Sequence, residues 1–294
     1  MSFISYLING ISLGSVYAII ALGYTMVYGI AKMLNFAHGD VIMVGGYVIM
    51  IMMTSFGINP ILSIIISAAV CTLLGITIER VAYKPLRNAG SPLAVLITAI
   101  GVSYLLQNLA LLFWGADTKV FPSVVSIPAV SLADGQLIIS GETIVTIITC
   151  IIIMLGLTWF VKKTKAGQAM LAVSEDKGAA QLMGINVNGT IALTFAIGSA
   201  LAAVAAALLC SSYPSLSPYT GSMPGIKAFV AAVFGGIGSI PGAFIGGILL
   251  GVIEIFGKAY ISSTLADAIV FGVLIIVLLV KPTGLLGKPL QEKV

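Results

Sequence analysis

The 294-residue chain is 59% hydrophobic and only 8% charged, with a formal net charge of +4 and a mean hydropathy of +1.15. A soluble domain carries about 25% charged residues, so this composition excludes a water-soluble globular protein and indicates an integral membrane protein. The sparse basic charge gives no support to nucleic-acid binding. The three cysteines lie in apolar runs and are predicted to be free and buried, without a disulfide framework or metal spacing: Cys71, Cys150 and Cys210.

The first thirty residues lack the basic start and the cleavage site of a signal peptide, so we expect a retained membrane span. A bilayer core about 30 Å thick needs around 20 apolar residues per helix. The sequence therefore predicts an all-α polytopic membrane protein with about eight transmembrane helices, forming a single domain over residues 1–294. The candidate spans are 5–30, 41–56, 60–82, 92–114, 142–161, 190–212, 224–257 and 266–281.

The distribution of basic residues predicts the orientation, because cytoplasmic loops of membrane proteins are enriched in lysine and arginine. If the loops that follow the third and fifth spans and the end of the chain lie inside, eleven of the fourteen basic residues are cytoplasmic. The N-terminus is then external and the C-terminus cytoplasmic. The three basic residues expected outside are Lys119, Lys227 and Lys258.

The stretch "NFAHGD" follows the first span and holds the only histidine, His38, close to Asp40. We expect it near the cytoplasmic end of the first two spans, or as a break that dips into the membrane. Asn35 and Asp40 can cap backbone groups freed at such a break, and Gly39 allows the turn. A structural joint that lets the first helix pair bend is the favoured interpretation.

Two connections are long, an external segment at 115–141 and a cytoplasmic segment at 162–189. The cytoplasmic one predicts a helix of about nine residues, too short to be stable alone, so it must be held by its flanking spans or by a partner protein. An ordinary connector and a docking element both fit. The helix is expected to begin at the N-cap Ser174, with Glu175 and Asp176 in its first turn, Ala179, Ala180 and Met183 on one face, Gly184 as the stop and Ile185 packing back.

Residues 224–257 are apolar but interrupted by "GGIGSIPG". The first arm is short for a full span, which leaves open a re-entrant half-helix followed by a longer helix, or a tight hairpin of two spans. The pattern of a break followed by a helix rich in small residues also occurs in "NFAHGDVIMVGGYVIMI", and a duplicated half would explain it. We expect four glycines after the break to form a packing face and not a binding site: Gly242, Gly246, Gly247 and Gly251.

Four stretches, in matching order along nearly the whole chain, resemble the Liv-type permease family of branched-chain amino-acid ABC importers. The stretch "SEDKGAAQLMGIN" is similar to the cytoplasmic loop with which bacterial ABC importer permeases contact their ATPase. The other three stretches are "LGYTMVYGIAKMLNFAHGDVIMVGGYV", "AYKPLRNAGSPLAVLITAIGVSYLLQN" and "KPTGLLG". Lys84 and Lys281 stand where family members often have arginine, and neither change threatens the assignment.

The resemblance implies a transport subunit and not an enzyme. The sequence has no G-x-x-x-x-G-K-[ST] phosphate loop, so ATP and Mg²⁺ are expected on two partner ATPase subunits docked at residues 174–185. This chain itself is expected to bind no cofactor or metal. A second related permease, an external solute-binding protein that touches 115–141, and the bacterial inner membrane complete the expected setting. The carried solute stays open, because related permeases carry urea, amides or other amino acids.

Intramembrane polar residues are the best markers of a solute pathway or its gate. For each one alone, a hydrogen bond between helices is the more common role. Gln107 and Asn108, adjacent in an apolar run, are the first choice for a functional role. The other candidates are Thr25, Asn35, His38, Asp40 and Thr98, with Tyr24 and Glu254 as further intramembrane polar groups.

Two rival functions remain. A proton-coupled secondary transporter would need Asp40 or His38 on the pathway, which requires "NFAHGD" to dip into the membrane, whereas the charge count places it near the cytoplasmic face. An intramembrane aspartyl protease would need a second aspartate beside "AHGD", and Asp267 is the only other candidate near a span. The protease is strongly disfavoured, since its signature has glycine where this chain has Ala37.

Overall fold

The computed structural model describes residues 2–88, 92–125, 127–132 and 137–287. Six of its helices are long and apolar enough to span a membrane, and three shorter apolar helices of 14 to 17 residues accompany them. At 1.5 Å per residue, a helix of 17 residues reaches only about 25 Å. The protein is thus helical and multi-pass, but the short helices correspond to the expected spans 41–56 and 266–281 and to the first arm of 224–257.

In chain order the first elements are α1 (Ser2–Ala31), α2 (His38–Thr54), α3 (Pro60–Ile78), the π-helical turn η1 (Glu79–Tyr83), the 3₁₀ turn η2 (Lys84–Asn88) and α4 (Pro92–Trp114). Then come β1 (Lys119–Val120), β2 (Val130–Leu132), β3 (Leu137–Ile139), α5 (Gly141–Lys163), α6 (Lys165–Glu175) and α7 (Lys177–Leu182). The last elements are α8 (Val187–Ser212), β4 (Ser215–Leu216), α9 (Ser222–Gly235), α10 (Ile240–Tyr260) and α11 (Ala266–Val280).

Side-chain caps fix where several of these helices begin. Asn59, Ser140, Asn186 and Ser239 each accept a hydrogen bond from a backbone N–H in the first turn of α3, α5, α8 and α10. Such a cap satisfies a backbone donor that has no partner inside the helix, which matters most where water is scarce. These four residues therefore mark the starts of spans that apolar composition alone leaves approximate.

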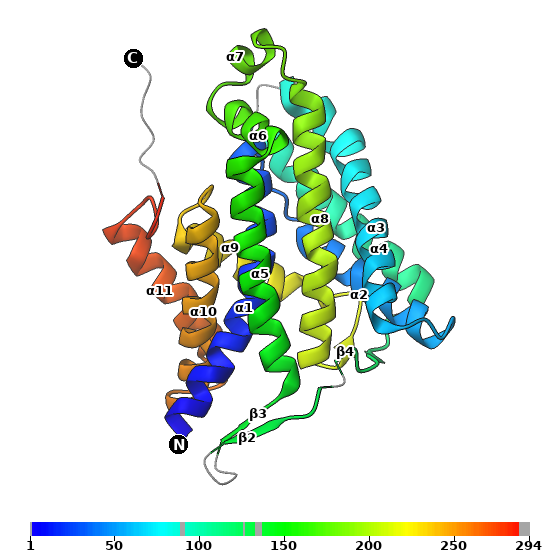
Figure 1. Ribbon diagram of the computed structural model, residues 1–294, viewed down its shortest axis with the longest axis vertical. Helices are drawn as coiled ribbons and strands as arrows, with labels where there is room; N and C mark the ends of the chain where they lie inside the picture. The colour runs from blue at the N-terminus through cyan, green and yellow to red at the C-terminus, as the bar shows by residue number, and fades with distance from the viewer. Residues whose placement is uncertain (1, 89–91, 126, 133–136, 288–294) are drawn as a thin grey trace.

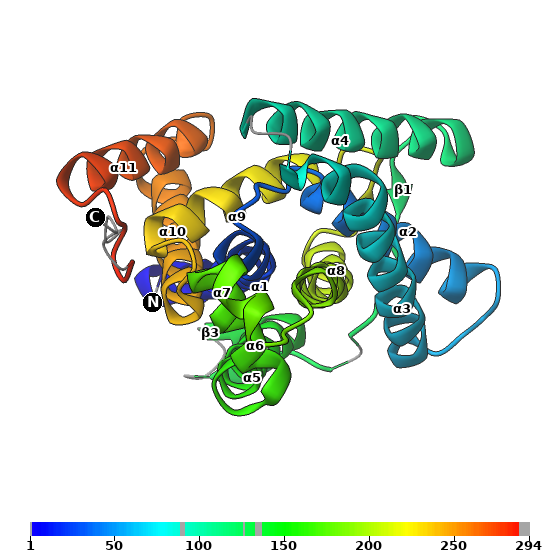
Figure 2. The ribbon, with the colours of Figure 1, turned by 90° about the horizontal axis from the view of Figure 1, so that it is seen from above.

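The helix α1 lies in the middle of the bundle, with α8 beside it (Figure 2). Its residues from Val16 to Leu22 are all at most 4% exposed, which is typical of a helix surrounded on every side. The helix packs closely against α10 because both carry glycine at the crossing. A Cβ atom on Gly247 would lie 2.4 Å from the Cα of Ala18, so only glycine permits this approach.

The chain contains two similar halves, α1–α4 and α8–α11. In each half a long central helix is followed by a short helix, and the pairing between halves is reciprocal: α1 packs on α10 and α3 on α8, while α9 packs on α1 and α2 on α8. The helices α1 and α8 start at opposite ends of the molecule (Figure 1). This is the arrangement of an inverted repeat. The structural counterpart of α2 is α9. The sequence pattern instead compared α2 with the glycine-rich stretch of α10, and these two segments are not equivalent in the repeat.

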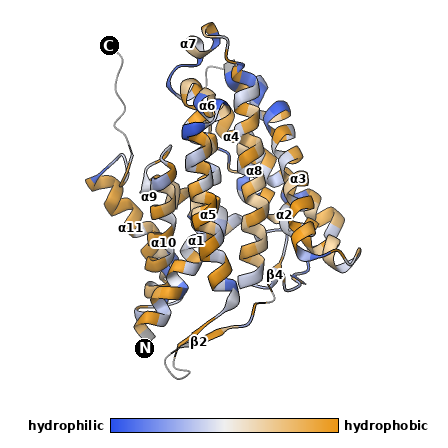
Figure 3. Cartoon of the chain, viewed as in Figure 1, coloured by the Kyte–Doolittle hydropathy of each residue, from blue (hydrophilic) through white to orange (hydrophobic). Residues whose placement is uncertain are grey.

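The two long connections lie at opposite ends of the bundle (Figure 1). The helices α6 and α7 cap one end, while β2 pairs antiparallel with β3 at the other. A second short ladder joins β1 to β4, with Lys119 opposite Leu216. Apolar residues cover the helices between the two ends, and hydrophilic residues gather around α6 and α7 (Figure 3). This pattern fits a bilayer around the middle of the molecule.

Candidate solute site and coupling segment

The joint between α1 and α2 lies inside the bundle. After Ala31 the chain turns at Lys32, whose φ of 56° is unusual for a residue with a side chain, and α2 begins at His38. The imidazole of His38 packs edge-on against Tyr24, with ring centroids 4.8 Å apart. Tyr24 lies seven residues before the end of α1, about 10 Å along the helix axis. The "NFAHGD" stretch thus dips into the bundle, which agrees with the second of the two places expected for it and not with the cytoplasmic end of the spans.

The side chain of Asn35 does not bond as a capping group would. Asn35 is buried, and its Oδ1 accepts a hydrogen bond from the Tyr83 hydroxyl at 3.1 Å. The N-cap of α2 is Ala37, which makes no side-chain cap. Among the described residues no partner faces the buried Nε2 of His38. The capping role predicted for Asn35 and Asp40 is therefore wrong, and Asn35 instead ties the joint to η1.

Asp40 lines a cavity between α2, α4 and α9, whose wall is mostly apolar with a few polar groups. Its Oδ1 accepts a hydrogen bond from Gln107 Nε2 at 2.9 Å, and the same nitrogen lies 3.3 Å from the hydroxyl oxygens of Ser103 and Ser222. The cavity measures about 300 Å³. We call it the Asp40 cavity, and its lining consists of Tyr24, Phe36, Gly39, Asp40, Ile100, Ser103, Tyr104, Gln107, Ser222, Gly225 and Ile226.

Close glycine contacts hold the starts of α2 and α9 together beside this cavity. A Cβ atom on Gly221 would lie 1.7 Å from the carbonyl oxygen of Gly39, and one on Gly225 would lie 3.0 Å from its Cα. We call Gly39, Gly221 and Gly225 the glycine seam. The seam brings the first turns of two short helices, one from each half of the repeat, to a single point within the bundle.

The remaining predicted pathway residues scatter. Asn108 is exposed on α4, and its Nδ2 donates to the Tyr104 carbonyl of the same helix at 2.8 Å, so it faces away from its neighbour Gln107. Thr98 is half-buried on α4. Thr25 is buried on α1, and its hydroxyl has no partner among the described residues. Of the predicted set, the structure brings Asp40 and Gln107 into direct contact.

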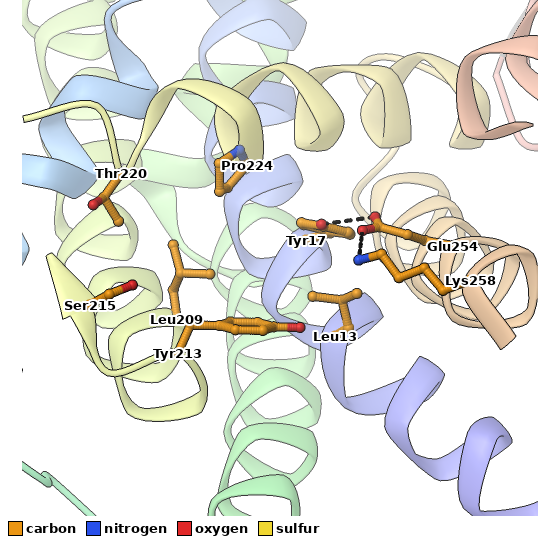
Figure 4. Close-up of a pocket in the computed structure, with 9 residues that line it drawn as sticks. All are labelled: Leu13, Tyr17, Leu209, Tyr213, Ser215, Thr220, Pro224, Glu254 and Lys258. Atoms are coloured by element: carbon orange, nitrogen blue, oxygen red, sulfur yellow. Dashed lines mark hydrogen bonds and ion pairs between the residues drawn. The ribbon is translucent and has the colours of Figure 1, made fainter. Parts of the chain in front are cut away.

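A second cavity, of about 320 Å³, is lined by Tyr17, Glu254 and Lys258 among other residues (Figure 4). The carboxylate of Glu254 accepts hydrogen bonds from Lys227 at 2.9 Å, Lys258 at 2.6 Å and the Tyr17 hydroxyl at 2.9 Å. Lys227 also pairs with Asp267 at 2.7 Å. We call these five residues the Glu254 cluster. Two lysines and two carboxylates leave it without net charge.

The Glu254 cluster corrects one step of the sequence reasoning. Lys227 was expected on the external side, but it is 7% exposed and lies on α9 inside the bundle. A lysine in a short apolar helix with a glutamate on the next helix is a pattern that indicates a buried pair, because an unpaired ammonium there would be costly. Asp267, the second aspartate considered for a protease, forms an ion pair with Lys227 and does not line the Asp40 cavity.

The four predicted packing glycines of α10 contact two different helices. Gly247 and Gly251 lie against α1, where a Cβ atom would come within 2.4 Å of Ala18 and 2.2 Å of Gly14. Gly242 and Gly246 lie against α9, within 2.5 Å of Gly235 and 2.2 Å of Ala231. The short helix α9 is thereby clamped to α10 along its second half.

The predicted coupling helix starts later than expected. Ser174 lies in the last turn of α6, and its hydroxyl donates to the Leu171 carbonyl at 2.7 Å, so its predicted role as N-cap is wrong. Asp176 is the N-cap of α7, with Oδ1 accepting from the Ala179 N–H at 3.0 Å. Glu175 ends α6 and is exposed. Glu175 and Asp176 thus lie at the boundary between α6 and α7, and not in the first turn of a helix that begins at Ser174.

The end of α7 has the geometry expected from its glycine. Gly184 has a φ of 82°, its N–H donates to the Gln181 carbonyl, and the N–H of Ile185 donates to Ala180, both at 3.0 Å. This pair of hydrogen bonds is typical of a helix that ends at a residue in the left-handed conformation. Ala179 and Met183 are four residues apart and both exposed, whereas Ala180 is buried, so Ala180 does not lie on the face predicted for all three.

The exposed side of α7 is apolar at its tip and anchored at its base. Leu182 and Met183 are 90% and 82% exposed. At the other end of the helix, Lys177 Nζ donates to the carbonyl oxygen of Ala31, the last residue of α1, at 3.1 Å. Burial lowers the pKa of Lys177, and the nearby charges of Arg87 and Lys32 lower it further. The base of α7 is therefore bonded to the point where α1 turns towards the Asp40 cavity.

Comparison with known proteins identifies the family. Residues 6–279 match the family model described as branched-chain amino acid transport system / permease component. The permease protein BraD of Pseudomonas aeruginosa is 45% identical over 99% of this chain and 98% of its own length. LivH of Salmonella typhimurium is 46% identical over the same shares, and a probable LivH of Methanocaldococcus jannaschii is 31% identical over 92% of this chain and 88% of its own. The chain therefore belongs to the branched-chain amino-acid permeases of ABC transport systems, as a multi-pass membrane transport subunit and not an enzyme.

Proposed function

We propose that this chain forms one half of the translocation pathway of an ATP-driven importer for branched-chain amino acids. The observation that carries the proposal is the Asp40 cavity, where the first turns of two short helices meet within the membrane. Its wall combines a few polar groups with Phe36, Ile100 and Ile226. A zwitterion with an apolar side chain needs such a mixture. Transporters with inverted repeats also bind their solutes at the repeat interface.

The proposed orientation places the α6–α7 end in the cytoplasm and the β2–β3 end outside. The lysines on α5, α6 and α7 lie at the α6–α7 end, which agrees with the enrichment of basic residues in cytoplasmic loops. Nine crossings then result, six from the long helices and three from α2, α9 and α11, an odd number that fits an external N-terminus and a cytoplasmic C-terminus. In this arrangement the non-helical residues 32–37 and 213–221 complete the passages that α2 and α9 are too short to make alone.

We further propose that α7 docks to an ATPase subunit. The exposed Leu182 and Met183 supply an apolar tip that fits a groove on a partner. Movement of α7 would pass through the bond from Lys177 to Ala31 into residues 32–37, and from there to Asp40. ATP and Mg²⁺ belong to the two ATPase subunits in this scheme, and this chain binds neither.

A second, related permease would complete the pathway. Exposed apolar side chains surround the cavity on α4 and α9, among them Ile97, Tyr104 and Ile226. The helices α4, α9 and α11 lie along the same side of the bundle (Figure 2). A partner permease on this side would cover both the apolar residues and the cavity. An external solute-binding protein, proposed to contact 115–141, would deliver the amino acid in a bacterial inner membrane.

Uptake by the reconstituted complex tests the proposal against a proton-coupled carrier, the alternative that a deeply buried Asp40 would favour. The complex is placed in proteoliposomes with radiolabelled leucine and binding protein on one face and ATP on the other. We expect uptake only when ATP is on the face that carries α6 and α7, with no effect of a protonophore. Uptake that follows a proton gradient when the ATPase cannot hydrolyse ATP would overturn the proposal.

A further inference from the structure

The carboxylate of Asp40 is buried without a positive partner. Asp40 is 2% exposed, and the groups that donate to it are neutral: the amide of Gln107, the hydroxyl of Ser103 and its own backbone N–H. Within the described parts of the chain, no lysine or arginine forms an ion pair with it. A charge in a membrane interior is costly unless it is neutralised, and such a residue indicates a functional site. None of the described residues supplies the missing positive charge, so a proton or a bound cationic group has to provide it.

The cavity beside this carboxylate has the shape and chemistry of a small-solute site. Its volume of about 300 Å³ lies at the lower end of the roughly 300–1,000 Å³ typical of ligand pockets. The carboxylate and the hydroxyls of Ser103 and Ser222 stand at one point of the wall, where Gln107 connects them. The apolar side chains Phe36, Ile100 and Ile226 form other parts of the lining.

We infer that Asp40 is the counter-charge for the ammonium group of the transported amino acid, in a binding site formed by the Asp40 cavity. This inference rests on the proposed function, since it assigns the solute of that pathway to one place. The ammonium donates to the carboxylate, and the branched side chain lies against the apolar wall. A sodium ion would also neutralise Asp40, but it would leave the apolar lining without a role.

The glycine seam explains why the site can open and close. Because Gly39 precedes Asp40 directly and contacts Gly221, a separation of α2 from α9 moves the carboxylate away from Ser222. A backbone-to-backbone contact has no side chains that interlock, so it can separate without repacking a core. Binding and release of the ammonium are thereby linked to the position of two short helices.

Direct binding to the whole importer complex in lipid nanodiscs tests the inference, with radiolabelled leucine as the probe and no binding protein present. We expect leucine to be displaced by isoamylamine, which keeps the ammonium, and not by 4-methylpentanoate, which keeps only the carboxylate. Asp40→Asn should weaken leucine binding roughly 10- to 100-fold, the loss expected for one charge-assisted hydrogen bond. Asp40→Glu, which keeps the charge, should bind leucine more tightly than Asp40→Asn and less tightly than the wild type.

Neighbouring residues of α4 provide a matched control. Gln107→Leu should weaken binding, because it removes the donor that orients Asp40, whereas Asn108→Leu should not, because Asn108 bonds only to its own helix. Leucine affinity unchanged in Asp40→Asn, displacement by 4-methylpentanoate alone, a requirement for sodium, or no saturable binding to the wild-type complex would each overturn the inference. ATP-driven uptake by the same wild-type complex is measured in parallel. Its absence would refute the proposed function instead.

Discussion

The contacts between α2 and α4 and between α9 and α11 are counterparts in the two halves of the repeat, yet their chemistry is opposite. In the first half, Asp40 meets the neutral Gln107. In the second half, Lys227 meets Asp267, and Glu254 completes the pairing from α10. Each short helix is thus joined to the last helix of its own half through a polar side chain near its start.

The difference shows how one architecture can serve two purposes. The Glu254 cluster neutralises itself, so it needs nothing from outside and fixes α9 against its neighbours. Asp40 has no positive partner among the described residues, so a proton or a bound ligand has to neutralise it. A buried ion pair contributes little net stability, although removing one partner is costly. The cluster is therefore a structural joint, and the Asp40 cavity is the half of the repeat that is available for solute.

Neutral substitutions of Glu254 and Asp40 should give the largest difference in stability between the two halves. Glu254→Gln leaves Lys258 without its acid and Lys227 with only Asp267, and it should cost about 3 kcal/mol of stability. Asp40→Asn should be neutral or stabilising, because it removes an uncompensated charge. The thermal unfolding midpoint of the purified chain in detergent is the measurement, with the exposed Asp117→Asn as control. Equal losses in both variants would show that Asp40 is structural too.

The glycine seam that both halves share offers the next test. Gly221→Ala places a methyl group on the Gly39 carbonyl, which should force α2 and α9 apart and cost about 1–3 kcal/mol, with a loss of leucine uptake. Gly101→Ala on α4 is the control, since no atom lies within 4 Å of the added Cβ. Wild-type uptake by Gly221→Ala would mean that the seam does not position the cavity.

Local signals in the sequence predicted a good part of this arrangement. The apolar runs predict the long helices, and Gly184 predicts the end of α7, because a left-handed residue there needs no long-range contact. The start of α7 was missed by two residues. Ser174 and Asp176 are both good N-cap residues, and the choice between them depends on how far α6 continues, which its amphipathic packing on the bundle decides.

Long-range contacts limit how much of the candidate site can be predicted from the sequence. Asp40 and Gln107 are 67 residues apart, and nothing local in either segment shows that they meet. Gln107 and Asn108 are equally polar in the sequence, but one helical step of 100° turns one towards the cavity and the other away. Lys227 was placed outside because counting basic residues assumes that they avoid the membrane, which fails when two carboxylates on other helices neutralise the charge.

The smallest expected effect concerns how the two joints respond to the ATPase. Lys177 bonds to the end of α1, which leads directly to the Asp40 joint, whereas the Glu254 cluster has no such connection to α7 among the described contacts. Lys177→Met should lower stability by no more than about 1 kcal/mol. It should also reduce leucine transported per ATP hydrolysed while the ATPase still co-purifies.

The comparison variants define what that result means. Leu182→Asp should remove the ATPase altogether, because it places a charge on the exposed apolar tip, and Lys165→Met, at the exposed start of α6, should change neither property. If Lys177→Met left the transport ratio unchanged, the signal from α7 would have to reach Asp40 by another route. If less leucine is transported per ATP hydrolysed while docking stays normal, the turn after Ala31 transmits the ATPase movement to Asp40. The half of the repeat with the uncompensated carboxylate is then the half that responds.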